Sequence, residues 1–381
     1  MKPKSTISTR AEAEQAFLVG VENKARADGW TISSSLDELS YLAQTAEAEV
    51  VGRLSQNLNR PSSTYYIGAG KLKELISLRE QSKYNLVVFD DELSPRQQRN
   101  LEEALKVKVI DRTALILDIF TRRAQTREGQ LQVELAQHKY LLPRLAGQWS
   151  HLERLGGGIG TRGPGESQLE TDRRLIRNRI HRLQTQLEAV RHHRALYRQR
   201  RKKSQCPIVA LVGYTNVGKS TLLNALSQAS VLTEDKLFST LDPVTRRLVL
   251  PNNQEFLLTD TVGFIHKLPP SIVAAFRATL EELTEADLLL HVVDITHYNA
   301  AEQYQTVESI LDDLSLSNKP KLTVLNKLDV SVGSEDELVA LAIPTELPSD
   351  EAMLISAIKG WGLDKLMDKI AVSLATILVP H

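Results

Sequence analysis

The chain has 381 residues, enough for two or three domains, and its 47 Lys+Arg are balanced by 47 Asp+Glu. The 42% hydrophobic and 25% charged content is typical of a globular protein, and a single cysteine, Cys206, excludes a disulfide framework and a cysteine-rich metal site. No apolar run approaches the roughly 18–20 residues of a membrane-spanning helix, and no secretory signal is visible, so we expect a cytoplasmic protein. Taken alone, the zero net charge argues against a polyanionic partner such as nucleic acid.

Residues 1–115 are predicted to form a parallel α/β domain. The predicted elements are strands over residues 16–21, 86–89 and 107–110, and a helix over residues 95–105 with Pro95 at its first position. Ser94 and Pro95 are typical of a capped helix start. A strand, a helix and a strand in succession favour a parallel sheet, here in a segment with 16 basic and 16 acidic residues.

Residues 116–203 carry two heptad patterns, which predict two helices. The first seam is Leu131, Leu135, His138, Leu142, Leu145, Trp149 and Leu152, and the second is Ile176, Ile180, Leu183, Leu187, Val190, Arg194 and Tyr197. The glycine-rich residues 156–165 between them are not expected to be helical, and Pro143 predicts a kink or break in the first helix. We expect an antiparallel helical hairpin with 19 Lys+Arg against 8 Asp+Glu.

Residues 204–381 return to alternating strands and helices, the doubly wound α/β pattern. Strands are predicted over residues 208–212, 256–258, 288–293 and 322–325. This segment has 12 basic and 23 acidic residues, so the zero net charge of the whole chain conceals a basic middle segment beside an acidic C-terminal one. Whole-chain charge is therefore the wrong scale at which to exclude a polyanionic partner.

Residues 213–220, GYTNVGKS, match the phosphate-binding pattern G-x-x-x-x-G-K-[ST] between a predicted strand and a predicted helix. Glycines let backbone N–H groups converge on phosphate oxygens, and the helix N-terminus adds positive potential. Lys219 would neutralise the β- and γ-phosphates, and Ser220 would coordinate Mg²⁺. The alternative is a glycine-rich turn that binds nothing, and further motifs argue against it.

Three short motifs follow at predicted strand ends and complete a guanine-nucleotide pattern. In residues 260–263, DTVG, Asp260 would hold Mg²⁺ through water and the Gly263 N–H would meet the γ-phosphate. Residues 326–329, NKLD, select guanine, because Asp329 accepts from two donors that adenine lacks. After the apolar residues 353–355, the Ala357 N–H would meet guanine O6. Each tetrapeptide is weak alone, but their order is a strong signal.

The predicted site residues lie in these motifs or in the segment between the first two. Those predicted to bind the nucleotide are Gly213, Tyr214, Thr215, Asn216, Val217, Gly218, Lys219, Ser220, Phe238, Ser239, Thr240, Leu241, Asp242, Asp260, Thr261, Val262, Gly263, Asn326, Lys327, Leu328, Asp329, Ser356, Ala357 and Ile358. Lys219, Thr240 and Gly263 are predicted to act in catalysis. For the threonine that senses the γ-phosphate through Mg²⁺, the pattern prefers Thr240 and leaves Thr245 open; either can instead be a turn residue.

Phe264 stands where Ras-like GTPases carry the glutamine that orients the attacking water. A phenyl ring cannot hydrogen-bond that water. Either Phe264 simply packs in the core, or intrinsic hydrolysis is slow and a partner completes the site; both can hold together.

The second predicted helix is strongly basic, with 12 Lys+Arg against 3 acids over residues 170–203. A charged helix often presents only a solvated face. Here the charge is one-sided and acidic partners are few, which favours a polyanion, and Arg162 adds charge in the glycine-rich segment. Aromatic residues are sparse, so structured RNA fits better than stacked single strands.

These motifs together resemble the HflX family of ribosome-associated translational GTPases. The most specific segment is GGGIGTRGPGESQLETDRR at residues 156–174, and YIGAGK at 66–71 and VFDDELSPRQ at 88–97 resemble the family's N-terminal signatures. GYTNVGKS, LFSTLDPVTRR and DTVGF resemble its G domain, and the likeness spans roughly residues 15–380. Two departures are Ser167, where threonine is common, and the end of this chain at His381, where some relatives continue into another domain.

The resemblance implies binding to the large ribosomal subunit through the N-terminal domain and hairpin, ribosome-stimulated GTP hydrolysis, and splitting of stalled or idle ribosomes under stress. It places Mg²⁺ on Ser220 and Thr240. Some members also hydrolyse ATP, and RNA unwinding has been ascribed to some.

We therefore expect an N-terminal parallel α/β domain (1–115), a basic antiparallel helical hairpin (116–203) and a Ras-like P-loop G domain (204–381). The substrate and product would be GTP and GDP, the cofactor Mg²⁺, and the partner the large (50S) subunit and its rRNA, with a monomer when free and no membrane span. Alternatives are a GTP-gated RNA-binding scaffold with negligible turnover, an NTP-dependent RNA-remodelling protein, and an RNA-modification GTPase. The last is disfavoured, because this sequence shows no second catalytic site.

Overall fold

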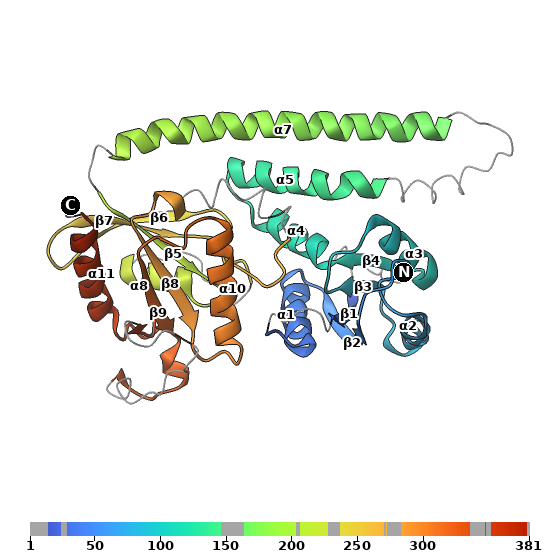
Figure 1. Cartoon of the computed structure of the whole chain (residues 1–381), viewed down its shortest axis with the longest axis horizontal. Coiled ribbons are helices and arrows are strands. Elements are labelled where there is room, and N and C mark those ends of the chain that lie inside the picture. The colour runs from blue at the N-terminus through green and yellow to red at the C-terminus, as the bar shows by residue number, and fades with distance from the viewer. Residues whose placement is uncertain are drawn as a thin grey trace, which may run out of the picture. The chain divides into compact units, whose positions relative to one another are not determined.

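The computed structural model describes residues 14–23, 29–145, 164–202, 206–227, 237–269, 272, 283–335, 347 and 352–378 (Figure 1). Its chain forms two compact units, residues 1–116 and 117–381. Across the described ranges, no helix is long and apolar enough to cross a membrane.

The first unit contains a four-stranded, fully parallel sheet of order β2-β1-β3-β4. The strands are β1 (Gln15–Asn23), β2 (Glu49–Leu58), β3 (Leu86–Phe89) and β4 (Lys108–Asp111), and the helices are α1 (Ile32–Thr45), α2 (Ala69–Ser82) and α3 (Pro95–Leu105). Every residue of β3 is buried, as expected for a parallel sheet with covered faces. The predicted parallel α/β architecture is confirmed.

Helix α3 begins at Pro95, the first helical position that the sequence predicted. The Ser94 hydroxyl accepts from the Gln97 N–H at 3.3 Å, and the Gln97 side chain accepts from the Ser94 N–H at 2.9 Å. Pro95 occupies the first helical position, where its missing N–H costs nothing. This reciprocal cap fixes the helix start locally, which is why the sequence could predict it.

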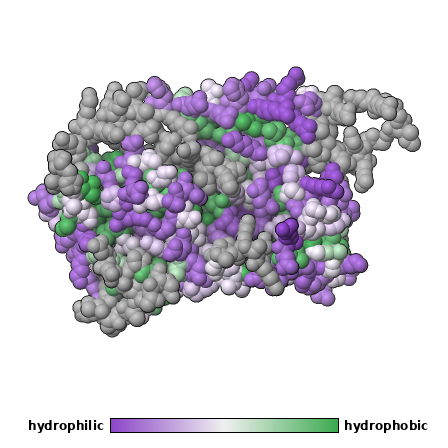
Figure 2. Space-filling view, in the orientation of Figure 1, coloured by the Kyte–Doolittle hydropathy of each residue, from purple (hydrophilic) through white to green (hydrophobic). Residues whose placement is uncertain are grey.

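The second unit starts within α4 (Arg112–Arg123) and continues through α5 (Arg127–Leu141), a 3₁₀ turn η1 (Leu142–Arg144) and the 39-residue α7 (Pro164–Lys202). Helices α5 and α7 run antiparallel (Figure 1). Their seam is a cluster of Leu131, Leu135, Leu183 and Leu187, with Ile180 packed against it. Figure 2 shows this apolar band beneath the hydrophilic outer face of α7.

Two details of the hairpin prediction are tested by the helix boundaries. The expected break at Pro143 is confirmed, because α5 ends at Leu141 and a 3₁₀ turn follows. The expectation that the non-helical segment extends to Gly165 is wrong at its end: Pro164 and Gly165 begin α7, since proline is well tolerated in a first helical turn. The remaining glycine-rich residues, 156–163, and the predicted seam residues Trp149 and Leu152 lie outside the described ranges.

The remainder of the second unit is a six-stranded sheet of order β10-β9-β8-β5-β7-β6, parallel except that β6 pairs antiparallel with β7. The strands are β5 (Ile208–Gly213), β6 (Val244–Val249), β7 (Glu255–Asp260), β8 (Leu288–Asp294), β9 (Lys321–Asn326) and β10 (Met353–Leu354). The helices are α8 (Lys219–Ser227), α10 (Ala300–Asp313), the 3₁₀ turn η2 (Leu328–Val330) and α11 (Leu363–Leu378). Carboxyl ends of parallel strands meet at one edge, so β5, β7 and β9 bring the three motifs together there.

Candidate guanine-nucleotide site

The P-loop joins the end of β5 at Gly213 to the start of α8 at Lys219. The Lys219 side chain is 6% exposed, and its Nζ donates to the carbonyl oxygens of Gly213 at 3.1 Å and Tyr214 at 2.6 Å. Burial lowers the pKa of Lys219 to about 8, against an opposing effect of the nearby Asp260 carboxylate. The loop therefore holds a desolvated cation beneath a helix N-terminus, an arrangement suited to phosphate.

Three oxygen-bearing side chains converge beside this lysine. The Ser220 and Thr240 hydroxyls donate to Asp260 Oδ2 at 2.6 Å and 2.8 Å, and the two hydroxyls lie 2.7 Å apart. Asp260 is fully buried, which raises the pKa of its carboxyl, while Lys219 and the two hydroxyl hydrogen bonds oppose that rise. Its Oδ1 has no hydrogen-bond partner in the described part of the chain.

This donor set fits Mg²⁺. The ion prefers hard oxygen ligands and keeps several waters, so two hydroxyls and a nearby carboxylate suffice when phosphates supply the rest. Soft or imidazole-rich alternatives find no support, because the described residues contain no group of three His, Cys, Asp or Glu placed to hold a metal. The buried, unpartnered Asp260 Oδ1 is the type of acceptor that a coordinated water would satisfy.

The two threonines that the sequence left open lie in different environments. Thr240 is beside Ser220 and Asp260. Thr245 is exposed on β6, and its hydroxyl lies 3.0 Å from that of Thr259 on β7. Only Thr240 is near the candidate Mg²⁺ ligands.

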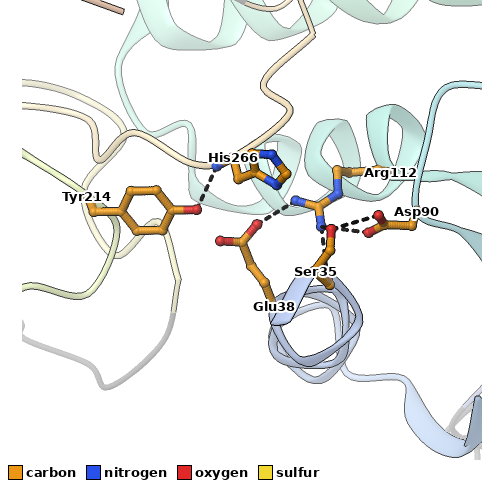
Figure 3. A network of polar contacts seen from close by, with 6 residues as sticks. All are labelled: Ser35, Glu38, Asp90, Arg112, Tyr214 and His266. Carbon is orange, nitrogen blue, oxygen red and sulfur yellow. Dashed lines mark hydrogen bonds and ion pairs between the residues drawn. The ribbon is translucent and has the colours of Figure 1, made fainter. Parts of the chain in front are cut away.

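The residues after Asp260 are tied to the P-loop by three hydrogen bonds. The Thr215 N–H donates to the Phe264 carbonyl at 2.8 Å, the Phe264 N–H donates to the Gly213 carbonyl at 3.1 Å, and the His266 N–H donates to the Tyr214 hydroxyl at 2.6 Å (Figure 3). Together they hold the chain against the phosphate-binding loop.

This close approach explains the glycine and the aromatic residue next to it. A Cβ on Gly263 would lie 2.8 Å from Thr215 Cα and 3.0 Å from Lys219 Nζ, so a side chain there would push the strand end off the P-loop. The Phe264 side chain is 2% exposed and packs in the core. The packing interpretation of Phe264 is therefore correct.

At the other end of the site, Asn326 connects three loops. Its Nδ2 donates to the Val217 carbonyl at 2.8 Å, and its Oδ1 accepts from the Ala357 N–H at 3.0 Å. The Ser356 hydroxyl donates to the Asp329 carboxylate at 2.5 Å. These bonds hold the Asp329 carboxylate beside Ser356, but they also engage the Ala357 N–H, which the sequence predicted to meet guanine O6, on the Asn326 side chain.

A cleft lies at this site, and its lining matches only part of the residues that the sequence predicted to bind the nucleotide. The cleft is lined by Thr215, Asn216, Gly218, Lys219, Ser220, Thr221, Phe238, Ser239, Thr240, Thr261 and Gly263. Thr221, which directly follows the P-loop motif, was not predicted. The Thr261 hydroxyl turns away to the Leu211 carbonyl at 2.6 Å, and Ile358 is 72% exposed. The Asp242 carboxylate also points away from the cleft, toward the start of α5.

The first unit contains a buried ionic network that the sequence analysis did not identify (Figure 3). The Arg112 guanidinium donates to Glu38 at 2.5 Å and to Asp90 at 2.7 Å, and the Ser35 hydroxyl donates to Asp90 at 2.7 Å. Burial alone would lower the pKa of Arg112, but the two carboxylates outweigh it and raise the pKa above its ordinary value. The only sequence signal was a charged residue directly after each of two apolar strands, β3 and β4.

Comparison with known proteins decides the family. Family models match residues 33–121 (GTP-binding GTPase N-terminal), 123–201 (GTP-binding GTPase Middle Region) and 208–327 (50S ribosome-binding GTPase). The chain is 51% identical to the GTPase HflX of Caldanaerobacter subterraneus subsp. tengcongensis, over 94% of this chain and 80% of that protein. The chain belongs to the HflX family of GTPases.

Other HflX relatives and a solved structure are similar over most of the chain. The GTPase HflX of Escherichia coli (strain K12) is 43% identical over 97% of this chain and 84% of that protein. The crystal structure of a GTP-binding protein from Sulfolobus solfataricus in complex with GDP is 26% identical, with a TM-score of 0.45, covering 95% of this chain and 99% of that one. As an HflX-family member, the chain is a GTP-hydrolysing enzyme with a P-loop GTPase domain, which sets aside a scaffold with negligible turnover.

Proposed function

We propose that this HflX-family GTPase binds the large (50S) ribosomal subunit and its rRNA through the first unit and the α5–α7 hairpin. There it hydrolyses GTP with Mg²⁺ and acts in splitting or rescuing ribosomes under stress. A ribosomal partner would place the protein in the cytoplasm, and we expect a monomer when it is free. The observation that carries the proposal is a one-sidedly basic helix in the same unit as a guanine-nucleotide site.

The charge of α7 is concentrated away from its apolar seam. The leucines of the seam pack against α5, while Arg174, Arg177 and Arg182 are exposed. The outer face of α7 is hydrophilic (Figure 2). Two of the exposed arginines form ion pairs: Arg179 with Glu134 of α5 at 2.5 Å, and Arg177 with Glu170 at 3.4 Å. An excess of exposed arginine favours a phosphate backbone, and arginine pairs well with phosphate oxygens.

The large subunit is the polyanion favoured by the family comparison. The family model that matches residues 208–327 is described as a 50S ribosome-binding GTPase. Phosphate and shape recognition by a helix whose sequence contains few aromatic residues suits folded rRNA better than single strands.

In the proposed reaction, water attacks the γ-phosphate of GTP and GDP leaves with its two phosphates held by the P-loop. Ser220 and Thr240 would hold Mg²⁺, and Asp260 would act through a coordinated water. When bound, the ion would neutralise negative charge on the phosphates. Lys219 would stabilise negative charge on the phosphates, and the Gly263 N–H would bind a γ-phosphate oxygen. Because the buried Phe264 cannot orient the water, a ribosomal group would position it.

Base selection is proposed to rest on Asp329, which the Ser356 hydroxyl holds in place. Adenine offers Asp329 no donor and would leave a desolvated carboxylate unpaired. We expect ATP to be rejected by roughly a hundredfold or more.

The decisive experiment is pelleting with large subunits in GDP, GTP and a non-hydrolysable GTP analogue, combined with turnover measurements. We expect binding that depends on the nucleotide and falls steeply with salt. Turnover should rise about tenfold or more with subunits and fall to background in Lys219→Ala. Turnover that subunits do not change would overturn the ribosomal part of the proposal.

A further inference from the structure

The segment that carries Thr240 contacts α4, which precedes the hairpin, on one side and the start of α5, the first helix of the hairpin, on the other. Phe238, two residues before Thr240, packs edge-on against Phe120 of α4 with ring centroids 4.7 Å apart. Asp242, two residues after Thr240, hydrogen-bonds to the residues that start α5. Both contacts lie within the second unit.

The Asp242 carboxylate uses both of its oxygens on the start of α5. Oδ2 accepts from the N–H groups of Gln125 at 2.9 Å and Thr126 at 2.8 Å, and Oδ1 accepts from the Thr126 hydroxyl. Thr126 is the N-cap of α5, and the same hydroxyl accepts from the Gly129 N–H at 3.0 Å. A carboxylate at this position also interacts favourably with the positive end of the helix.

Gly129 shows how closely the two segments approach. A Cβ at that position would lie 2.3 Å from Asp242 Oδ1. An alanine there would therefore displace the carboxylate from the helix start, although alanine is the better helix former.

The aromatic contact on the other side of Thr240 is equally specific. The side chains of Phe238 and Phe120 are 2% and 1% exposed. Phe238 has a φ of +57°, which is uncommon for an aromatic residue and persists only where surrounding contacts impose it. The segment is thus held in one conformation by α4 and α5.

These contacts argue against Asp242 as a nucleotide ligand. Its acceptors are already engaged by three donors of residues 125–126. A carboxylate is also poorly suited to contact phosphates, since like charges repel. Its position two residues from Thr240, within about 7 Å along an extended chain, suits a mechanical link instead.

We infer that Asp242 is a positioning residue for GTP hydrolysis, one that ties the Thr240 segment to the first turn of α5 and so couples the hairpin to the Mg²⁺ site. The inference rests on the proposed function, in which Thr240 binds Mg²⁺ and the hairpin binds rRNA. A shift of α5 on the ribosome would move Asp242, and with it the Thr240 hydroxyl beside Ser220 and Asp260. By reciprocity, a change at Thr240 would alter the affinity of the hairpin for its partner.

The test compares Asp242→Asn, Thr126→Val and Gly129→Ala in the full chain, with Thr126→Ser as the matched control that keeps the capping hydroxyl. The first readout, without ribosomes, is the Mg²⁺ concentration that gives half-maximal GTP turnover. We expect each of the three variants to raise it about fivefold or more, with Mg²⁺-free GDP affinity changed less than about twofold. Thr126→Ser should behave as the unsubstituted chain.

A double variant tests whether Asp242 and Thr126 act through the same contact. If Asp242 and Thr126 act through one contact, Asp242→Asn combined with Thr126→Val should be no worse than either alone. The inference is overturned if Asp242→Asn weakens GDP binding while Thr126→Val and Gly129→Ala leave the Mg²⁺ dependence unchanged. It is also overturned if Thr126→Val lowers thermal stability with no effect on the Mg²⁺ dependence, because α5 capping would then be merely structural.

The ribosomal readout keeps this inference separate from the proposed function. We expect Asp242→Asn to pellet with large subunits in the GTP analogue but to lose about fivefold or more of the stimulation. If the unsubstituted chain shows no stimulation, the proposed function fails while the Mg²⁺ readout still judges the role of Asp242.

Discussion

The side-chain amide of Asn326 donates a 2.8 Å hydrogen bond to the carbonyl oxygen of Val217, which joins the end of β9 to the P-loop. The same amide accepts from the Ala357 N–H, so one buried side chain links the loops expected to contact the base to the loop expected to contact the phosphates. The loops proposed to recognise the base and to bind the phosphates therefore share a structural support.

Replacing Asn326 should weaken the proposed base recognition and phosphate binding together. In Asn326→Ala, we expect GTP and GDP affinities to fall about tenfold or more and by similar factors, because neither lost bond involves the γ-phosphate. Leaving the buried carbonyl and N–H unpaired should also lower the free energy of unfolding by about 1–3 kcal/mol. Titration with fluorescent GTP and GDP measures the first effect, and Asn252→Ala in an exposed turn is the control. A loss confined to GTP would contradict this account.

The buried Lys219 predicts that stability depends on pH. Its pKa is about 8 in the folded chain, below the ordinary value of 10.5, so between these values the folded state binds fewer protons than the unfolded state. Stability of the nucleotide-free protein should therefore rise with pH above about 8, by up to about 3 kcal/mol at full titration. Urea unfolding at a series of pH values should show this rise, and Lys219→Met should lose it. A rise that persists in Lys219→Met would assign the effect to another group.

The Tyr214 hydroxyl is the sole side-chain group among the three hydrogen bonds described between the P-loop and residues 264–266. Tyr214→Phe keeps the buried ring but leaves the His266 N–H without that acceptor, at a cost of about 1–3 kcal/mol. Because this bond holds the segment after Gly263, we expect single-turnover GTP hydrolysis to slow severalfold while GDP affinity stays near its original value. An equal fall in GDP affinity would instead indicate damage to the whole P-loop.

In the first unit, Arg112 neutralises two buried carboxylates, those of Glu38 and Asp90 (Figure 3). Arg112→Met would remove the cation that pairs with both carboxylates and should destabilise this unit by about 3–5 kcal/mol. Denaturation followed by tryptophan or circular-dichroism signals should then show an early transition, while GTP affinity of the second unit is retained. Arg53→Met, at a half-exposed pair with Asp37, is the matched control and should cost less than about 1 kcal/mol.

Charge reversal on α7 tests the proposed ribosomal surface. Arg174→Glu combined with Arg182→Glu should lower affinity for large subunits about tenfold or more and reduce the salt dependence of binding, since fewer counterions are released. Lys365→Glu with Lys369→Glu on α11 makes the same change in net charge and should have little effect. Pelleting over a range of salt measures both pairs, with GTP affinity as the folding control. Equal losses in the two pairs would point to total charge rather than to α7.

Much of the fold could be predicted because it is encoded locally. The buried strands β3, β5 and β8 are continuous apolar runs, α3 carries its own cap, and the leucine seam of the hairpin repeats at heptad spacing. Strand β6 was not predicted, because it lacks such a local apolar pattern. Its residues Thr245, Arg246 and Arg247 are exposed at a sheet edge and form no apolar run.

The sequence by itself determined the chemistry of the candidate site: a P-loop lysine, hydroxyl and carboxylate groups proposed to bind Mg²⁺, and a carboxylate proposed to select guanine, each in a short motif. Tertiary structure decided which side chains reach that site. Thr240 lies beside Asp260 and Thr245 does not, and Asp242, predicted as a nucleotide ligand, binds the start of α5. Asp242 and Thr126 are 116 positions apart, and a hydrogen bond over that separation depends on how helices and sheet pack, which no local pattern records.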